Sequence, residues 1–487
     1  MWLQSTFGLS ATGREDELSK EGIEDCVSGK PASRENLYSA VRQCQQGNCA
    51  IQRAGKPCGS RKTASSFSKK GGVMNGSRKK EIVATLDLGT SKVVVLIAEV
   101  GEDGVSVLGI GRAETDGLRR GVVISIGKAV EAILKAKHDA EQMSGYLVRE
   151  VIAGVGGTHI VGVNNHGMIT TKMGEIRVAD VERVLEAASM VPMQMDRSIV
   201  NCLPVQYLVD EHEGIRDPVG MSGVRLEAYT HLITGARTAI ENVLKCAERS
   251  GLRVVEFVAN PLASALAVLE PNEMEIGVCC LDLGAGTADL TIWTQGSLLH
   301  TCVLGAGGQV ITSDISTGLR TPLACAEELK IKQGVALGRL VPDGDTIEVP
   351  AVGGRPNKKL SRHALTEIIE PRVAEIFGLV RREILKTGYG DLLAGGVVLT
   401  GGSAQMPGMA ELGDVALNLP VRIGLPKNVK GLPSLLQDPA LSVAYGLAVY
   451  AGLPYNAAIP NSMLPVRRLN KPKGILQFLR RVAAVLF

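Results

Sequence analysis

Short apolar strand patterns alternate with amphipathic helix patterns from about residue 81 to residue 455. Runs rich in β-branched residues predict strands, and apolar residues that recur every three or four positions predict helices. The strands are expected at residues 82–86, 93–97, 253–258, 278–283, 289–293 and 396–399. The helices are expected at residues 127–143, 180–190, 238–250, from 260 onward, and at 366–387. This alternation predicts an α/β fold.

The first 80 residues break this pattern, because they are rich in Ser, Gly, Gln, Lys and Arg and hold no sustained apolar period. Segments that cannot bury apolar surface stay disordered, so we predict a disordered N-terminal extension. Met74 stands just before the first strand pattern. Two interpretations stay open: Met74 is the true start of the protein, or the upstream residues form a genuine arm.

Composition excludes several classes of protein. The chain has 487 residues, 45% of them hydrophobic, and a net charge of only +3, so we expect a sizeable core and no nucleic-acid partner. No apolar run reaches about 18 residues, so no bilayer-spanning helix is predicted. The ten cysteines include no C-x-x-C pair, which argues against a zinc site in the extension. Cys279 and Cys280 fall in a strand pattern and are expected to be buried thiols of a cytosolic protein.

Two equivalent glycine turns carry the candidate chemistry. Residues 86–92 read LDLGTSK and residues 281–289 read LDLGAGTAD. Each has an apolar strand, an acid, a glycine turn and a hydroxyl residue, followed by a second strand rather than a helix. The spacing indicates an internal duplication of a β-hairpin. Such turns can hold phosphate only with backbone N–H groups and hydroxyls.

Charged residues beside these turns suit a nucleotide with a metal ion. Asp87 and Asp282 end the first strand of each hairpin and can hold Mg²⁺, usually through water. Lys92 can add a point charge to the phosphates. A third turn, residues 398–404 with sequence VLTGGSA, follows a buried strand, and its paired glycines let a flat ring lie against the backbone. Any one turn is weak evidence, but all three in this order are specific.

These motifs resemble the superfamily of actin, Hsp70 and the sugar kinases. The resemblance implies two ribonuclease-H-like halves around a nucleotide cleft that binds ATP and Mg²⁺. Residues 260–265 and 442–448 match its two connecting helices, and residues 326–330 match the element beside the adenosine. The ATP ligands that it implies are Gly89, Thr90, Ser91, Lys92, Gly284, Ala285, Gly286, Thr287, Gly308, Glu327, Lys330, Gly401, Gly402 and Ser403. Ala285 stands where glycine is usual, which narrows the loop only if its φ is positive. No residue is assigned as a base for an attacking water, so we expect weak or no ATPase activity.

Within the superfamily the chain is similar to the FtsA family of bacterial cell-division proteins. The strings that carry this likeness are residues 217–226 (DPVGMSGVRL), 231–234 (HLIT), 312–315 (TSDI), 353–356 (GGRP) and 421–424 (VRIG). The resemblance implies head-to-tail polymerisation and a place at the division site, on the cytoplasmic face of the inner membrane. It implies attachment of the tubulin-like ring protein FtsZ through residues 309–392. It also implies that later division proteins dock on a subdomain inserted in the first half. Arg225 and the loop at 217–223 are either partner-facing or a surface turn.

The resemblance divides the chain into segments. Subdomain 1A comprises residues 81–159 and 237–277, and the inserted subdomain 1C lies between them at 160–236. Subdomain 2A comprises residues 278–308 and 393–455, with subdomain 2B at 309–392. The remaining segments are the extension at 1–80, a linker at 456–473 and a terminal helix at 474–487.

The sequence of the C-terminal segment at 474–487 predicts an amphipathic helix that contacts a membrane surface. Its 14 residues would extend about 21 Å, too short for a hydrocarbon core of about 30 Å, so it would lie in the interface. The anchoring residues we expect are Ile475, Phe478, Leu479, Arg480, Arg481, Val482, Leu486 and Phe487. The alternative is a helix docked on its own protein, but the proline-containing linker favours a free tether.

The charge distribution supports the membrane interpretation. The extension carries 14 basic and 7 acidic residues, residues 466–487 carry six basic residues and no acid, and a charge of −10 remains for residues 81–465. The acidic segment 81–465 would be repelled by an anionic membrane, and the basic segment 466–487 would be attracted to it. Two other functions stay open: an actin-like pilus-assembly adaptor, which needs no such tail, and a small-molecule kinase, which needs a catalytic Asp that no motif here identifies.

Overall fold

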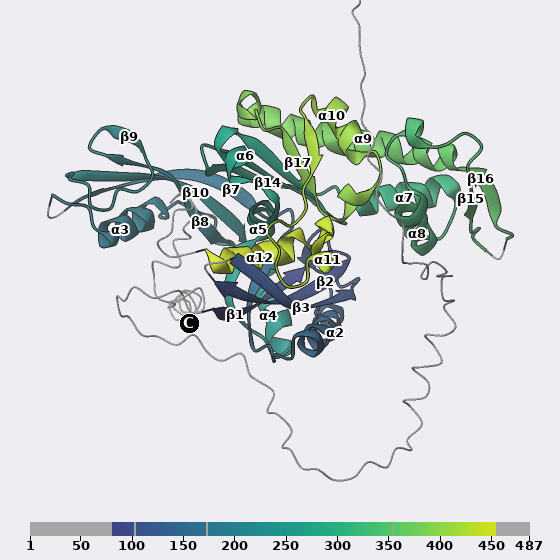
Figure 1. Cartoon of the computed structure of the whole chain (residues 1–487), viewed down its shortest axis with the longest axis horizontal. Helices are drawn as coiled ribbons and strands as arrows, with labels where there is room; N and C mark the ends of the chain where they lie inside the picture. The colour runs from purple at the N-terminus through teal and green to yellow at the C-terminus, as the bar shows by residue number, and fades with distance from the viewer. Residues whose placement is uncertain (1–79, 102–103, 172–173, 354, 454–487) are drawn as a thin grey trace, which may run out of the picture. The chain divides into compact units, whose positions relative to one another are not determined.

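The computed structural model describes residues 80–101, 104–171, 174–353 and 355–453 (Figure 1). The predicted extension, linker and terminal helix lie outside these residues. The described chain contains two large sheets and two short hairpins, and the α/β prediction is confirmed. Among the described residues, no helix is both long enough and apolar enough to cross a membrane.

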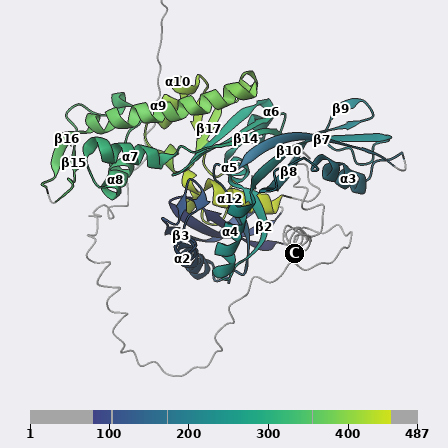
Figure 2. The same ribbon diagram turned by 180° about the vertical axis from the view of Figure 1, so that it is seen from behind.

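The first sheet has five strands in the order β11-β6-β1-β2-β3. Their bounds are β1 Glu81–Leu88, β2 Lys92–Gly101, β3 Gly104–Glu114, β6 Glu150–Val155 and β11 Arg253–Ala259. The pairs β1–β2 and β2–β3 are antiparallel, whereas β1–β6 and β6–β11 are parallel. Helix α2 (Ile126–Ser144) packs against β2 and β3, and α4 (Arg237–Arg249) lies beside α2 (Figure 2).

The second sheet repeats this arrangement in the order β18-β17-β12-β13-β14. Its strands are β12 Val278–Leu283, β13 Ala288–Thr294, β14 Ser297–Leu304, β17 Val397–Thr400 and β18 Val421–Ile423. The pairs β12–β13 and β13–β14 are antiparallel, and β12–β17 and β17–β18 are parallel. The predicted duplication therefore extends from one hairpin to two complete sheets.

Two helices separate the sheets, α5 (Asn260–Val268) and α12 (Ser442–Gly452), which lie side by side (Figure 1). They approach closely because Gly446 has no side chain: a β-carbon there would lie 1.7 Å from the carbonyl oxygen of Ala263. The Thr85 hydroxyl of β1 donates to the Ala444 carbonyl of α12 at 3.0 Å. Because side chains alternate along a strand, Asp87 lies on the same side of β1 as Thr85. The acid at the end of β1 thus faces the helix pair between the sheets.

Helices on the opposite side of the second sheet form a separate core. Cys279 and Leu281 belong to this core, whereas Val278 and Cys280 face α5 and α12, so alternate positions of β12 point to different cores. Both cysteines are buried free thiols, as predicted. The elements around this second core are α7 Gly308–Leu319, α8 Leu323–Gln333, α9 Arg362–Thr387, α10 Met409–Leu417 and the hairpin β15 Thr346–Val349 with β16 Lys358–Ser361. The remaining short elements are β4 Leu118–Arg119, β5 Val122–Val123, α6 Pro271–Ile276, α11 Pro433–Leu436, η1 Gly338–Leu340, η2 Gly390–Leu392, η3 Gly402–Gln405 and η4 Pro439–Leu441.

An inserted subdomain leaves the first half after β6 and returns at α4. It consists of β7 Val161–Thr170, α3 Val178–Ala188, β8 Arg197–Val209, β9 His212–Ile215 and β10 Arg225–Ala236, with a small core of its own. The loop at 217–223 is tied to the start of α3, since Gly220 N donates to the Ile176 carbonyl at 2.8 Å. Arg225 pairs with Glu227 at 2.8 Å.

The inserted strands continue the second sheet rather than the first. The full order is β18-β17-β12-β13-β14-β7-β10-β8-β9, and Cys302 of β14 pairs with Val161 of β7. His231 of β10 is buried at this junction, with Nδ1 2.6 Å from Asn164 Oδ1 and Nε2 2.9 Å from Thr301 Oγ1. The histidine therefore joins the insertion to the second half by hydrogen bonds.

Candidate functional site

The first two glycine turns have the same backbone geometry. Gly89 N donates to the Lys92 carbonyl at 2.9 Å, and Gly284 N donates to the Thr287 carbonyl at 2.9 Å. In both cases the chain continues directly as a strand, β2 or β13, as the sequence predicts. Each turn is thus the end of a tight antiparallel hairpin, and the duplication holds at the level of single hydrogen bonds.

The two turns also lie against each other. A β-carbon at Gly286 would be 2.5 Å from Thr90 Oγ1 and 2.9 Å from the Arg120 α-carbon. Thr90 Oγ1 in turn accepts a hydrogen bond from Gly121 N at 2.9 Å. Only glycine at position 286 allows the turn of the second half to come this close to the first half.

The third turn packs on the second. Gly401 has a φ of +88°, and a β-carbon there would lie 2.3 Å from Asp282 Oδ1. The Ser403 hydroxyl donates to the Gly284 carbonyl at 3.2 Å. The three turns that the sequence singles out therefore form one continuous group.

Helix α7 begins at the second turn, a feature that the strand pattern did not indicate. Gly308 N donates to the Gly284 carbonyl at 2.9 Å, and Gln309 N donates to the Ala285 carbonyl at 2.7 Å. The first N–H groups of the helix are therefore occupied by the turn itself. Six described non-glycine residues have a positive φ and Ala285 is not one of them, so the alanine does not strain the loop.

Glu327 and Lys330 of α8 lie beside the start of α7. Lys330 Nζ donates to Glu327 Oε2 at 2.7 Å, to Thr312 Oγ1 at 2.9 Å and to the Gly308 carbonyl at 3.2 Å. Burial lowers the pKa of Lys330, and the charge of Glu327 opposes that shift. These two residues thus join Gly308 and the second turn in one hydrogen-bonded cluster.

Asp87, Asp282 and Lys92 are brought together between the sheets. Burial raises the pKa of Asp87 to about 7, Lys92 opposes this shift and Asp282 adds to it. Burial also raises the pKa of Asp282, again opposed by Lys92. Burial lowers the pKa of Lys92 to about 8, and its amine donates to the Ala440 carbonyl. The site therefore holds more acid than base in a poorly solvated place.

Asp289 is a third buried acid, which the sequence analysis did not single out as a ligand. It lies on β13, and its Oδ1 has no hydrogen-bond partner among the described residues. Burial raises the pKa of Asp289, and the charge of Asp282 adds to the shift. The signal available in the sequence was an acid inside an apolar strand. A buried carboxylate oxygen without a partner, beside two further carboxylates, fits a hard divalent cation such as Mg²⁺.

The predicted residues around the three turns and α8 thus converge, whereas the predicted membrane residues of 474–487 lie outside the described residues. Two duplicated halves, joined by crossing helices and closed by facing hairpin turns, define a two-lobed actin-like protein. The solved structures include a similar chain from a "PilM-PilN type IV pilus biogenesis complex", with a TM-score of 0.56 and 19% identity over 76% of this chain and 99% of that one. That likeness supports the fold alone.

Sequence comparisons give the family. The model "Cell division protein FtsA" matches residues 279–446, and "SHS2 domain inserted in FTSA" matches residues 157–234. The FtsA of Pseudomonas aeruginosa is 44% identical over 76% of this chain and 89% of its own length. The FtsA of Escherichia coli strain K12 is 39% identical over 76% of this chain and 90% of its own. The chain belongs to the FtsA family, and its function is that of an actin-like cell-division protein.

Proposed function

We propose that the protein binds ATP between its halves, polymerises on the cytoplasmic face of the membrane and attaches the FtsZ ring there. The observation that carries nucleotide binding is the contact of the two equivalent turns, with Gly286 against Thr90. Facing hairpins of this kind offer backbone N–H groups from both halves to one string of phosphates.

The nucleotide is assigned to the residues that converge around the turns. Residues 89–92 and 284–287 would hold the phosphates, with Lys92 adding a charge. Gly308, Glu327, Lys330 and residues 401–403 would surround the adenosine. This assignment is supported by the hydrogen bonds and close approaches that connect these residues.

A magnesium ion would be held through water by Asp87 and Asp282, with Asp289 as a third acid nearby. When bound, the ion neutralises phosphate charge. The carboxylates would fix its position, and Lys92 would balance part of their charge in the poorly solvated site. No described residue is assigned as a base, so we propose nucleotide binding with weak or no hydrolysis.

The partners are assigned to separate segments. FtsZ would bind within residues 309–392, which include α8, α9, the β15–β16 hairpin and all of α7 except its first residue. Later division proteins would dock on the inserted subdomain at 160–236, and the terminal helix at 474–487 would lie on anionic lipid. The division at residues 81–159, 237–277, 278–308 and 393–455 into subdomains 1A and 2A belongs to the same proposal.

One reconstitution tests this function. The full-length protein is mixed with anionic vesicles, Mg²⁺ and ATP, and filaments are sought by electron microscopy; fluorescent FtsZ then reports recruitment to the vesicles. We expect filaments with ATP, and FtsZ on the vesicles only when this protein is present. FtsZ that stays in solution beside vesicle-bound protein would refute the attachment role. Transfer of phosphate to a metabolite would favour the kinase alternative.

A further inference from the structure

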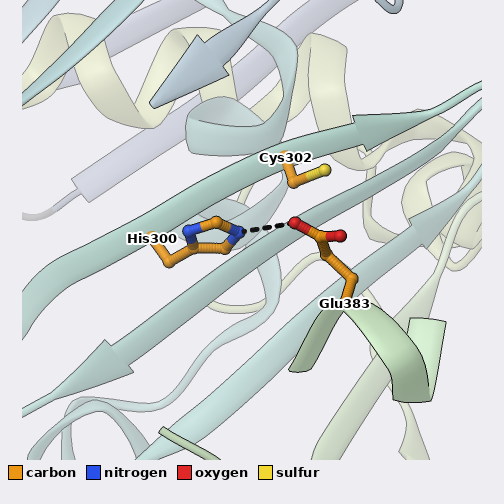
Figure 3. Close-up of side chains that lie close together, drawn as sticks. All are labelled: His300, Cys302 and Glu383. Atoms are coloured by element: carbon orange, nitrogen blue, oxygen red, sulfur yellow. Dashed lines mark ion pairs between the residues drawn. The ribbon is translucent and has the colours of Figure 1, made fainter. Parts of the chain in front are cut away.

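Three side chains with different metal-binding donor atoms converge between β14 and α9 (Figure 3). They are His300, Cys302 and Glu383, and their donor atoms all lie within 4.8 Å of one another. No second group of this kind occurs within the part of the chain that the structure describes. The group is separate from the acids assigned to magnesium.

The two elements present these side chains for simple geometric reasons. His300 and Cys302 are two residues apart on β14, so they project from the same face of the strand. Glu383 reaches them from the last turns of α9. A ligand contributed from so distant a part of the sequence forms no local motif, which is why residue spacing did not reveal the group.

The separations suit a tetrahedral metal ion. His300 Nε2 lies 3.5 Å from Glu383 Oε1. Nitrogen and oxygen ligands of zinc lie about 2.0–2.2 Å from the ion, which places two such donors about 3.4 Å apart at a tetrahedral angle. Two of the three ligands are therefore already at the required spacing, and the Cys302 sulfur lies within 4.8 Å of both.

Neighbouring groups orient the ligands toward one point. Lys386 Nζ lies 2.9 Å from Glu383 Oε2, which leaves Oε1 directed at His300 (Figure 3). His300 Nε2 is buried, and apart from its ion pair with Glu383 it has no hydrogen-bond partner among the described residues (Figure 3). A cation at this point would bond to both groups of this long ion pair.

We propose that His300, Cys302 and Glu383 bind a zinc-like divalent transition-metal ion, with water as the fourth ligand. Nitrogen, sulfur and oxygen donors together suit Zn²⁺ rather than Mg²⁺. On binding, the Cys302 thiol releases its proton to solvent and the sulfur bonds to the metal. The His300 and Glu383 side chains are 22% and 16% exposed, which leaves access for the ion and the water. The bound ion would fasten α9 to the sheet.

The test uses the full-length protein after removal of metal with a chelator. Zn²⁺ is titrated calorimetrically, and Co²⁺ is added as a spectroscopic probe of a metal–sulfur bond. The variants are Cys302→Ser and Glu383→Gln, and the control is Cys325→Ser, a partly buried thiol of α8 outside the group. Loss of a group that merely orients a ligand costs about 10–100-fold in affinity, so loss of a ligand should cost more.

We expect the unchanged protein and Cys325→Ser to bind one ion in the group and to gain melting temperature as Zn²⁺ rises. Cys302→Ser should lack the Co²⁺–sulfur charge-transfer band. If the ligand variants misfold, alkylation of the unchanged protein decides: Zn²⁺ should slow iodoacetamide labelling of Cys302 but not of Cys325, as read by mass spectrometry. Equal Zn²⁺ affinity in all variants, or no protection of Cys302, would overturn the proposal.

Discussion

Gly286→Ala would test whether nucleotide binding depends on the contact between the two turns. The new β-carbon would lie 2.5 Å from Thr90 Oγ1 and 2.9 Å from the Arg120 α-carbon. Carbon atoms pack best at about 3.5–4.0 Å, so the turns must separate by roughly 1 Å. Overpacking of this kind costs about 1–3 kcal/mol. If this cost falls on the ATP-bound arrangement, ATP binds about 5- to 150-fold more weakly.

A matched control lies two residues away in the same turn. A β-carbon at Gly284 would meet Thr287 O at 3.4 Å, an ordinary contact, and neither glycine has a positive φ. The two alanine variants thus differ in the space available and not in backbone strain. Both proteins would be titrated with a fluorescent ATP analogue in Mg²⁺. Affinity of Gly286→Ala within twofold of the unchanged protein would refute the reasoning. Because Gly284 is itself assigned to the phosphates, a loss in Gly286→Ala no larger than the loss in Gly284→Ala would trace the effect to the phosphate site and not to the contact between the turns.

Three further predictions concern helix packing, pH and the tail. Gly446→Ala should lower the melting temperature, because its β-carbon would lie 1.7 Å from the Ala263 carbonyl oxygen. Gly378→Ala in α9 has open space around it and should raise the free energy of unfolding by about 0.5–1 kcal/mol. Calorimetry that finds Gly446→Ala the more stable of the two would contradict the packing argument. Burial lowers the pKa of His231 to about 3, so the unfolded chain binds more protons and stability rises with pH up to the ordinary value of about 6.5. Relative to His231→Gln, the unchanged protein should therefore gain about 1.4 kcal/mol per pH unit near pH 5 and about half of that at pH 6.5. Parallel urea-midpoint curves would exclude this role. Truncation after Lys473 should leave ATP binding intact and abolish sedimentation with anionic vesicles, and unchanged sedimentation would defeat the anchor.

The duplicated fold could be predicted from the sequence because both copies keep their chemistry at the same spacing. Asp87 and Asp282 each precede a glycine turn and a second apolar strand, and this local order is what β-hairpin formation requires. The two connecting helices were predicted from the resemblance to the superfamily, through residues 260–265 and 442–448. The strands and helices expected from these patterns agree closely with the observed elements.

The contacts between distant segments could not be read in the same way. Nothing in the sequence around Gly286 states that its missing side chain makes room for Thr90, because that space is created by the other half. The start of α7 at the second turn and the inclusion of Asp289 depend likewise on how β12, β13 and α7 pack. The insertion was expected, but its pairing with β14 was not. The sequence of an edge strand does not indicate which other strand will pair with it.

Because β7 pairs with β14, the inserted subdomain can be assigned to either half of the molecule, depending on whether chain connectivity or strand pairing is the criterion. By covalent connection the insertion belongs to the first half, since it leaves after β6 and returns at α4. By strand pairing it belongs to the second, through Cys302 and Val161, and His231 and Thr301 add a hydrogen bond there. Asn201 of β8 also accepts a hydrogen bond from Ala259 N of β11 in the first half. A rigid-body rotation of one half against the other must therefore either bend the chain at both ends of the insertion or shear this seam. The insertion therefore links the two halves, and a change in the angle between them would strain its connections or its strand pairing.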